Sequence, residues 1–286
     1  MDSSLFTVAQ QPAAHADGTA TAIVVESARP VGGAMRMLCA LPARGKAGLV
    51  AGRYLLARCG AQSAWERAEN WQIYFRRPLF AGGAPRPWPD DPGAELWPLL
   101  FPVDEDPGYR WLAQLPAGAA LNLVGPLGNG FHLPPTTRHL LLVAEEARLA
   151  HLLPLVDAAL DRGGSVSVVL VGAMSHAALQ TLLPMAVELR TVRPDDDWRA
   201  ALAAGVRWAD QLCLALPADT WPQLAELIRA QRYRLDPGFA LALVEADLAC
   251  GFGACLACVV PLGSNRLTRA CVHGPVFDLL ELVGEK

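Results

Sequence analysis

Near its C-terminus the chain reads Cys250-Gly251-Phe252-Gly253-Ala254-Cys255-Leu256-Ala257-Cys258, and a further cysteine, Cys271, follows after a polar turn. The spacing C-x4-C-x2-C with a fourth cysteine downstream is that of plant-type [2Fe–2S] proteins, in which one tight loop delivers three thiolates and a later segment supplies the fourth. Gly251 and Gly253 permit such a loop, because a residue without Cβ accepts positive φ and close approach of the backbone. The spacing predicts that these four cysteines ligate one [2Fe–2S] cluster.

Two other uses of the cysteines stay open. Disulfides require an oxidising compartment, whereas the sequence begins Met1-Asp2-Ser3-Ser4 without the basic and apolar regions of a secretion signal, and seven cysteines are an odd number. Zinc is the stronger rival because four cysteines can hold it, but structural zinc sites usually show paired C-x2-C knuckles and this segment has one. The three other cysteines stand among apolar neighbours and are predicted to be packing residues: Cys39, Cys59 and Cys213.

The segment around the cysteines resembles the cluster segment of the electron-transfer subunit of bacterial dihydroorotate dehydrogenase. The likeness covers Cys250 to Pro261 and Arg269 to Asp278, and Glu245 also fits it. Members of that family carry an FAD domain, a pyridine-nucleotide domain and a C-terminal [2Fe–2S] domain. The resemblance implies electron transfer between FAD and the cluster, within a hetero-oligomer, to or from a flavin-containing dihydroorotate dehydrogenase catalytic subunit of pyrimidine biosynthesis. It implies no acid–base catalytic residue in this chain and no complete enzyme without the partner.

Composition limits the other classes of protein. The chain has 286 residues, of which 52% are hydrophobic and 18% charged, which suits two compact domains with a small appendage. A net charge of −4 argues against a nucleic-acid binder. The most apolar stretch, Phe239 to Val260, is interrupted by Glu245 and Asp247, so we expect no membrane span and a cytoplasmic protein.

The order of patterns predicts an α+β multidomain protein. Short β-prone runs separated by glycine and proline predict an antiparallel β-barrel, and alternating apolar runs and helical patterns predict a doubly wound α/β domain. The expected domains are a mobile arm at 1–20, an FAD-binding barrel at 21–135, an NAD-binding-like domain at 136–235 and a [2Fe–2S] domain at 236–286. The expected barrel strands include 22–26, 35–39 and 71–75; the expected α/β elements are strands at 139–144, 165–172, 187–192 and 210–216 and helices at 148–160, 175–183 and 221–232.

The flavin site is expected at Arg76-Arg77-Pro78-Leu79, which resembles the family's Arg-Arg-Pro-Ile-Ser signature. The resemblance implies that Arg77 meets the FAD pyrophosphate, for which a guanidinium fork is suited, and that Pro78, Leu79 and Phe80 line the isoalloxazine. Phe80 stands where the family has serine. The alternative is that Arg76 and Arg77 are solvated charges at the barrel edge.

Three further segments bear on the flavin domain. Residues 86–93 are rich in turn formers and are expected to form a loop. Gly108 and Tyr109 lie where the family has a turn that cradles the FAD phosphates, with Tyr109 in place of threonine. The segment Gly125-Pro126-Leu127-Gly128-Asn129-Gly130-Phe131 matches the family almost letter for letter and predicts a tight loop between the barrel and the next domain.

The nucleotide domain departs from the family. A glycine-rich turn should follow its first strand and receive the pyrophosphate, but the chain has Ala144-Glu145-Glu146-Ala147-Arg148-Leu149-Ala150-His151. Two carboxylates oppose a phosphate, since like charges 4 Å apart cost roughly 4 kcal/mol at an effective dielectric constant of 20. We expect Glu145 and Glu146 to cap the helix that follows, and NAD(P) binding to be weakened or lost.

A second function remains open. The barrel and the sheet can be relics, and the chain then is a non-catalytic accessory subunit that binds one [2Fe–2S] cluster and docks onto a larger redox enzyme. Flavin absorption together with cluster absorption favours electron transfer from FAD, and cluster absorption alone favours the accessory subunit.

Overall fold

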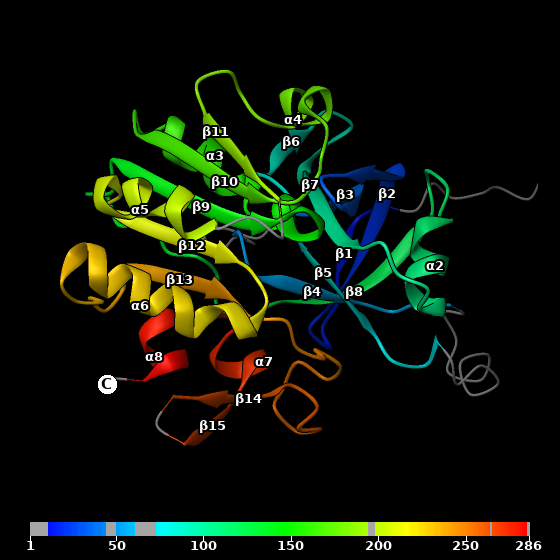
Figure 1. Ribbon diagram of the computed structural model, residues 1–286. Coiled ribbons are helices and arrows are strands. Elements are labelled where there is room, and N and C mark those ends of the chain that lie inside the picture. The colour runs from blue at the N-terminus through cyan, green and yellow to red at the C-terminus, as the bar shows by residue number, and fades with distance from the viewer. Residues whose placement is uncertain (1–10, 44–49, 61–72, 194–197, 264, 285–286) are drawn as a thin grey trace, which may run out of the picture.

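The computed structural model describes residues 11–43, 50–60, 73–193, 198–263 and 265–284. The N-terminal half forms an antiparallel barrel of six strands, closed by pairing of the second strand with the eighth. Figure 1 shows this barrel, in blue and cyan, beside an α/β sheet in green and yellow. The barrel strands, in spatial order, are β2 (Thr19–Val31), β3 (Ala34–Pro42), β7 (Asp91–Pro102), β5 (Arg77–Ala81), β4 (Tyr54–Ala57) and β8 (Ala120–Leu127).

The barrel core is filled by alternating residues of these strands. Leu79 and Ala81 of β5 point inward with Leu55, and the intervening Phe80 points out of the barrel, as the period of two in a strand requires. Helix α2 (Pro107–Ala113) adds Leu112 to this core and so covers one end of the barrel. The short strands β1 (Ala13–Ala14) and β6 (Arg86–Trp88) extend it at its edges.

Three expectations for this half are wrong. Residues 13–14 and 19–20 of the expected mobile arm pair in β1 and β2, while residues 1–10 lie outside the described part. The strand expected at 71–75 begins instead at Arg77; residues 71–72 lie outside the described part. The expected loop at 86–93 is a hairpin of β6 with β7. Gly108 lies in the first turn of a helix, because Asp106 caps this helix and proline occupies its first turn, and the expected role of Gly108 at the FAD phosphates stays a prediction.

The second half is a doubly wound sheet, as predicted. Five strands are parallel, and helices cover both faces, with Leu140 and Leu142 facing one layer and Leu141 and Val143 the other. One layer holds α3 (Leu153–Leu160) and α4 (His176–Leu182), and the other holds α5 (Trp198–Trp208) and α6 (Trp221–Arg232). The strands in order are β11 (Glu188–Val192), β10 (Ser165–Val171), β9 (His139–Glu145), β12 (Gln211–Ala215), β13 (Ala240–Leu243) and the antiparallel β16 (Val276–Asp278).

The expected helix at 148–160 is divided. A 3-10 segment, η2 (Glu146–His151), precedes α3, and a second short 3-10 segment, η3 (Ala218–Thr220), precedes α6. Pro154 lies in the first turn of α3, where its missing N–H costs nothing, so the chain restarts a helix there.

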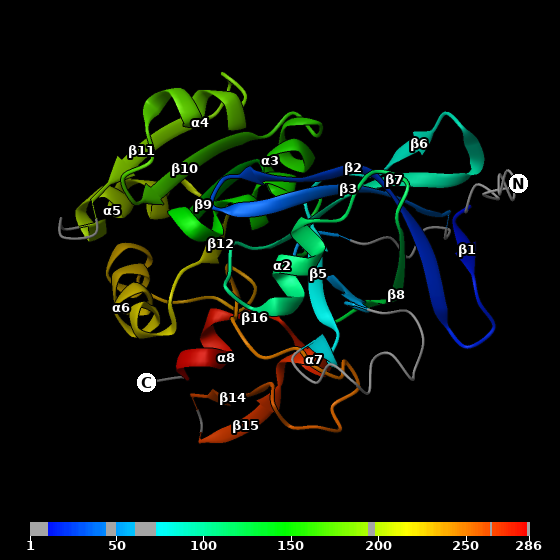
Figure 2. The same ribbon diagram turned by 90° about the vertical axis from the view of Figure 1, so that its right-hand side faces the viewer.

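The boundary expected at 235/236 does not divide the sheet. Strands β13 and β16 lie after that boundary but are its last two strands. Only the segment between them leaves the sheet, with the hairpin β14 (Val259–Leu262) and β15 (Arg266–Arg269) and helix α7 (Ala270–His273); α8 (Leu279–Val283) follows β16. Figures 1 and 2 both show this orange and red segment at the side of the molecule where barrel and sheet meet.

None of the helices within the described ranges combines the length and the apolar character that a membrane crossing requires.

Candidate functional site: a four-cysteine loop between barrel and sheet

The four predicted cluster ligands come together. Cys250, Cys255 and Cys258 lie on the loop between β13 and β14, and Cys271 lies in α7, which packs below that loop. Backbone amides point at sulfur: the N–H of Phe252 donates to Cys250 Sγ at 3.4 Å, and the N–H of Cys271 donates to Cys258 Sγ at 3.5 Å. Amides aimed at thiolates are the groups that stabilise and tune an iron–sulfur cluster.

The thiols are arranged as two pairs. Although burial alone raises the pKa of the Cys250 thiol, hydrogen bonds from Cys255, Phe252 and Ala254 lower it to about 6. Burial, and then the neighbouring Cys258, raise the pKa of Cys271 to about 12. Within the described residues, no three His, Cys, Asp or Glu side chains surround the position of a single metal ion. Two pairs of thiolates suit a cluster with two irons, since each iron takes two of them.

Two glycines hold the loop against its neighbours. Both have positive φ, +77° at Gly251 and +75° at Gly253. A Cβ on Gly251 would lie 2.6 Å from Leu127 Cδ1 of the barrel, and one on Gly253 would lie 2.9 Å from Arg269 Nη1. Arg269 in turn donates to the Gly253 carbonyl at 3.1 Å. The loop therefore depends on glycine for its conformation and for its close approach to the barrel and to Arg269.

The loop 125–131 also holds the cluster segment. It was predicted to join the barrel to the next domain, and it additionally binds the residues after Cys271. Asn129 donates from its side chain to the His273 carbonyl at 2.8 Å and from its backbone to the Gly274 carbonyl at 2.5 Å. Arg53 supports the loop by donating to the carbonyls of Gly128 and Pro126. The loop thus fixes the fourth ligand relative to the barrel.

Exposed apolar side chains of the cysteine loop and of the segment after it form what we call the apolar rim. Cys255 is exposed, and large apolar side chains next to it in the segment are also exposed: Phe252 69%, Leu256 59%, Leu267 72%, Val272 39% and Val259 37%. Apolar surface gathered at one site marks a region that another protein covers. A cluster held here would lie close to that covered surface.

The expected pyrophosphate ligand, Arg77, is bound to a carboxylate. Its Nε and Nη2 donate to Asp106 Oδ1 and Oδ2 at 2.8 and 2.9 Å, and its side chain is only 14% exposed. Asp106 Oδ1 also accepts the N–H groups of Gly108 and Tyr109 at 2.8 and 3.1 Å. Burial alone raises the pKa of Asp106, but Arg77 and these N–H groups lower it. Asp106 therefore receives the donors that a diphosphate would use.

The alternative of solvated charges is wrong for both arginines. Arg77 is bound as described, and Arg76 donates to the carbonyls of Leu56 and Asn122 at 3.0 and 3.1 Å. A Cβ on Gly108 would lie 2.9 Å from Arg77 Nε, so glycine is needed there for the arginine to lie across the helix start. The donors for a diphosphate are present, but FAD fits them only if Asp106 releases Arg77.

The residues expected around the isoalloxazine separate. Leu79 packs inside the barrel, so only its backbone can face a ligand, while Pro78 is partly exposed. Tyr109 stacks on Phe101, with ring centroids 6.0 Å apart, and burial raises its pKa. Phe80 packs where barrel and sheet meet, 4.9 Å from the His151 ring and 5.8 Å from the Tyr54 ring between centroids. Of the residues expected around the isoalloxazine, Phe80 is the one that faces the interface between the barrel and the α/β sheet.

The strand-end turn of the sheet is occupied by side chains. Glu146 accepts the N–H of Ala173 at 2.9 Å and packs on Gly172, and Arg148 binds both Glu145, at 3.6 Å, and Glu245. We expected Glu145 and Glu146 to cap the helix, and this expectation is wrong. The chain enters a 3-10 turn instead, and the side chain of its N-cap residue, Glu145, accepts no capping hydrogen bond. His151 Nδ1 is buried without a partner in the described residues, and burial, then Arg148, lower its pKa to about 4.

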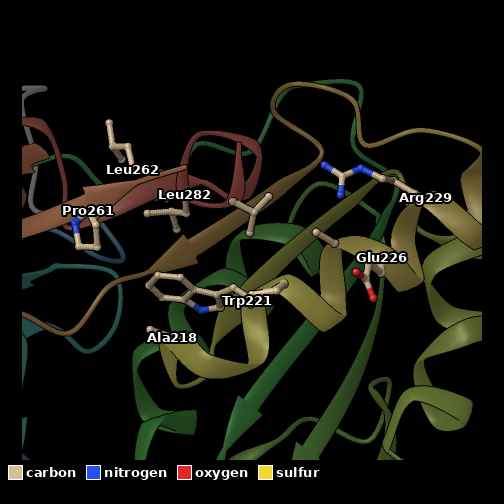
Figure 3. A pocket seen from close by; sticks show the side chains of 10 residues that line it. Ala218, Trp221, Glu226, Arg229, Pro261, Leu262 and Leu282 are labelled. Atoms are coloured by element: carbon tan, nitrogen blue, oxygen red, sulfur yellow. The ribbon is translucent and has the colours of Figure 1, made fainter. Parts of the chain in front are cut away.

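A separate cavity of about 380 Å³ lies between α6 and the segment that carries the cluster loop. Figure 3 shows Trp221 of α6 on one side and Leu282, Pro261 and Leu262 on the other. The indole Nε1 is buried and has no partner in the described residues, but it is enclosed and is not reached from the cavity surface. The charged side chains of Glu226 and Arg229 also line the cavity.

Sequence reasoning missed the residues that act through distant partners. Asp106 carried a readable signal, since an aspartate followed by proline and an apolar run predicts a helix start. Asn129 and Tyr54 carried no signal for their contacts, because Asn129 binds His273, 144 residues away, and Tyr54 packs against Gly128 in another strand's loop.

The chain resembles known proteins in sequence and in fold. Residues 245–283 match the family described as the iron-sulfur cluster binding domain of dihydroorotate dehydrogenase B. The electron transfer subunit of dihydroorotate dehydrogenase B from Geobacillus kaustophilus is 33% identical over 191 residues, 63% of this chain and 71% of that protein. The corresponding subunit from Desulforamulus reducens is 28% identical over 254 residues, 82% of this chain and 87% of that protein.

A solved structure of an NADH-dependent reduced ferredoxin-NADP oxidoreductase has the same fold. The TM-score is 0.65 at 18% identity, over 91% of this chain and 88% of that chain. The cytochrome b5 reductase domain of Ulva prolifera nitrate reductase is similar at a TM-score of 0.54 and 12% identity, over 82% of this chain and all of that domain. One third of the residues are shared over 71% of the Geobacillus kaustophilus subunit, and the family model covers all four cysteines. The chain therefore belongs to the family of electron transfer subunits of dihydroorotate dehydrogenase B.

Proposed function

We propose that this protein passes electrons between FAD and a [2Fe–2S] cluster, and through the cluster to or from a dihydroorotate dehydrogenase catalytic subunit in cytoplasmic pyrimidine biosynthesis. The observation that carries the proposal is that the cluster segment brings its four cysteines together, with the N–H groups of Phe252 and Cys271 aimed at the sulfurs of Cys250 and Cys258. Bound there, the cluster supplies one-electron transfer. The chain performs no acid–base step on a substrate and depends on its partner for a complete reaction.

The rim supports a protein partner. Phe252 and Leu256 lie in the same loop as the exposed Cys255, Leu267 lies in β15, and all three apolar side chains are more than half exposed. A partner that covers them would exclude water from the cluster and bring its own cofactor close to it, which is the arrangement that fast electron transfer needs. The proposed assembly is a hetero-oligomer.

Arg77 supports the FAD part of the proposal. Its fork lies at the end of the barrel, beside Gly108 and Tyr109, where two N–H groups also converge. When bound, FAD supplies exchange between two-electron and one-electron steps. The residues of this chain bind and orient the group: Arg77 takes the pyrophosphate in place of Asp106, and Pro78 and Phe80 form the adjacent wall.

NAD(P)H is proposed to be a poor electron donor. Glu146 already holds the N–H of Ala173, and Arg148 is held by Glu145 and Glu245, so the strand end offers a dinucleotide neither free amides nor a positive field. Electrons then enter from the partner.

Metal, sulfide and flavin analysis of the full chain purified anaerobically tests the proposal. We expect two irons, two sulfides and FAD per chain, and less FAD in Arg77→Ala, which loses charge-assisted bonds worth roughly 1.5–3 kcal/mol each. Zinc in place of iron, or unchanged flavin in Arg77→Ala, would contradict it. Anaerobic mixing with NADH is the third measurement: flavin bleaching at about 10 per second, an ordinary turnover rate, would show a working nucleotide site.

A second function is favoured by the Arg77–Asp106 pair and by Phe80 at the interface. In it the chain binds only the cluster and serves as an accessory subunit of a larger redox complex. Iron and sulfide without flavin, in protein that gains none on incubation with FAD, would select this function.

A further inference from the structure

Tyr54 lies on the barrel face that carries the cluster segment. In a strand, residues two apart share a face, so Tyr54 and Leu56 of β4 point the same way while Leu55 points into the barrel. Leu56 Cδ1 lies 2.9 Å from where a Cβ of Gly251, in the cysteine loop, would stand. Tyr54 Cε1 lies 2.9 Å from the corresponding position on Gly128, which also abuts the Gly274 carbonyl. The tyrosine ring is thus held between the loop 125–131 and the residues that follow Cys271.

The hydroxyl group of Tyr54 is buried and unsatisfied. The residue has no exposed surface, and its Oη has no hydrogen-bond partner in the described part of the chain. Leaving such a donor unpaired in an apolar interior is unfavourable, whereas phenylalanine would fill the same space without an unpaired polar group. A tyrosine at this position therefore calls for an acceptor that the described residues do not supply.

The Tyr54 ring lies near Gly128, which abuts Gly274, three residues after Cys271, on the side of the barrel that carries the cysteine loop. Tyr54 belongs to the same apolar core as Cys258 and Cys271. A tyrosine hydroxyl keeps its proton at neutral pH and can therefore act as a donor. A [2Fe–2S] cluster on these cysteines would bring sulfide and thiolate sulfur, both acceptors, into the core that surrounds it.

We propose that the Tyr54 hydroxyl donates a hydrogen bond to a sulfur of the [2Fe–2S] cluster and raises its reduction potential. This inference rests on the proposed function, because it requires the cluster. Reduction adds one negative charge to the cluster, so a donor to its sulfur stabilises the reduced form more than the oxidised form. Tyr54 is a positioning and tuning residue and takes no part in bond chemistry.

Tyr54→Phe removes the donor and keeps the ring. A hydrogen bond to a charged group contributes enough to change the equilibrium for one-electron reduction about tenfold, which corresponds to about 59 mV. We expect the midpoint potential of Tyr54→Phe, measured by titration followed by electron paramagnetic resonance, to be lower by about that amount. The control is Tyr233→Phe, because Tyr233 is 96% exposed and its variant should keep the wild-type potential.

A second measurement reports the bond directly. In deuterated buffer, reduced wild-type protein should show an exchangeable deuteron coupled to the cluster that is missing in Tyr54→Phe. Iron and sulfide content distinguishes a failure of the proposed function from a failure of the role of Tyr54. Wild-type protein without iron would refute the proposed function, whereas full clusters with equal potentials and equal couplings in both proteins would refute the role of Tyr54 alone.

Discussion

The cysteine loop and the Arg77 cradle are both places where backbone N–H groups and an arginine converge, and they differ in what those donors bind. At the loop, the amides of Phe252 and Cys271 point at cysteine sulfurs, which remain available to metal. At the cradle, the fork of Arg77 and the amides of Gly108 and Tyr109 all bind the carboxylate of Asp106. The sulfurs of the loop are therefore open to a metal, whereas the donors of the cradle are engaged by Asp106, with which a diphosphate would have to compete.

The largest effect is expected at the loop. Cys258→Ser should remove the cluster, because Cys258 is buried, receives the N–H of Cys271 and pairs with it. The matched control is Cys213→Ala, since Cys213 is equally buried but lies in β12, within the sheet. Iron and sulfide per chain are measured for both. Equal cluster content in the two variants would show that the loop is not the cluster site and would break the comparison.

A smaller effect is expected from the loop backbone. Gly253→Ala places a Cβ 2.9 Å from Arg269 Nη1 at a φ of +75°, and so displaces the arginine that donates to the Gly253 carbonyl. Gly118→Ala is the control, because its φ is +85° and nothing lies within 4 Å of the added Cβ. Both variants pay about 1–2 kcal/mol of unfolding free energy for the left-handed backbone. Only Gly253→Ala should also lose a large part of its cluster, measured as iron after gel filtration. Equal iron content in the two variants would show that Gly253 is needed only for its backbone conformation and not for its contact with Arg269.

The difference between the two regions also explains which parts could be predicted. The barrel and the doubly wound sheet were predicted because local patterns of apolar residues indicate them. The cluster was predicted from the spacing of the cysteines, which is also a local pattern. The strand at Arg77 was misplaced because the aromatic run before it is equally β-prone, whereas its pairing with β4 and β7 decides where it begins. Strands β13 and β16 were assigned to a separate domain because the residues of a strand do not reveal which strands it pairs with in the sheet. The pairing of Arg77 with Asp106 joins residues 29 apart, which no periodicity reports.

The smallest effect tests the cradle itself. Asp106→Asn keeps an oxygen that can cap α2 but removes the charge that competes with a diphosphate for Arg77. FAD then no longer has to displace one charge-assisted pair. The Kd for FAD, measured by fluorescence titration, should therefore fall about tenfold.

Acid cannot replace this substitution. The pKa of Asp106 is lowered below its ordinary value of 3.8, so the carboxylate stays charged, and its stabilising pair with Arg77 is lost only as the pH falls through that lowered pKa. The wild-type affinity for FAD should therefore be flat from pH 6 to 8, and the variant should bind more tightly by the same factor throughout. Arg77→Ala, tested in parallel, should bind FAD weakly with or without Asp106→Asn, because the shared donor is gone. If Asp106→Asn instead weakened FAD binding, Asp106 would be a support for the diphosphate ligand, and the two regions would be alike in keeping their donors for a cofactor.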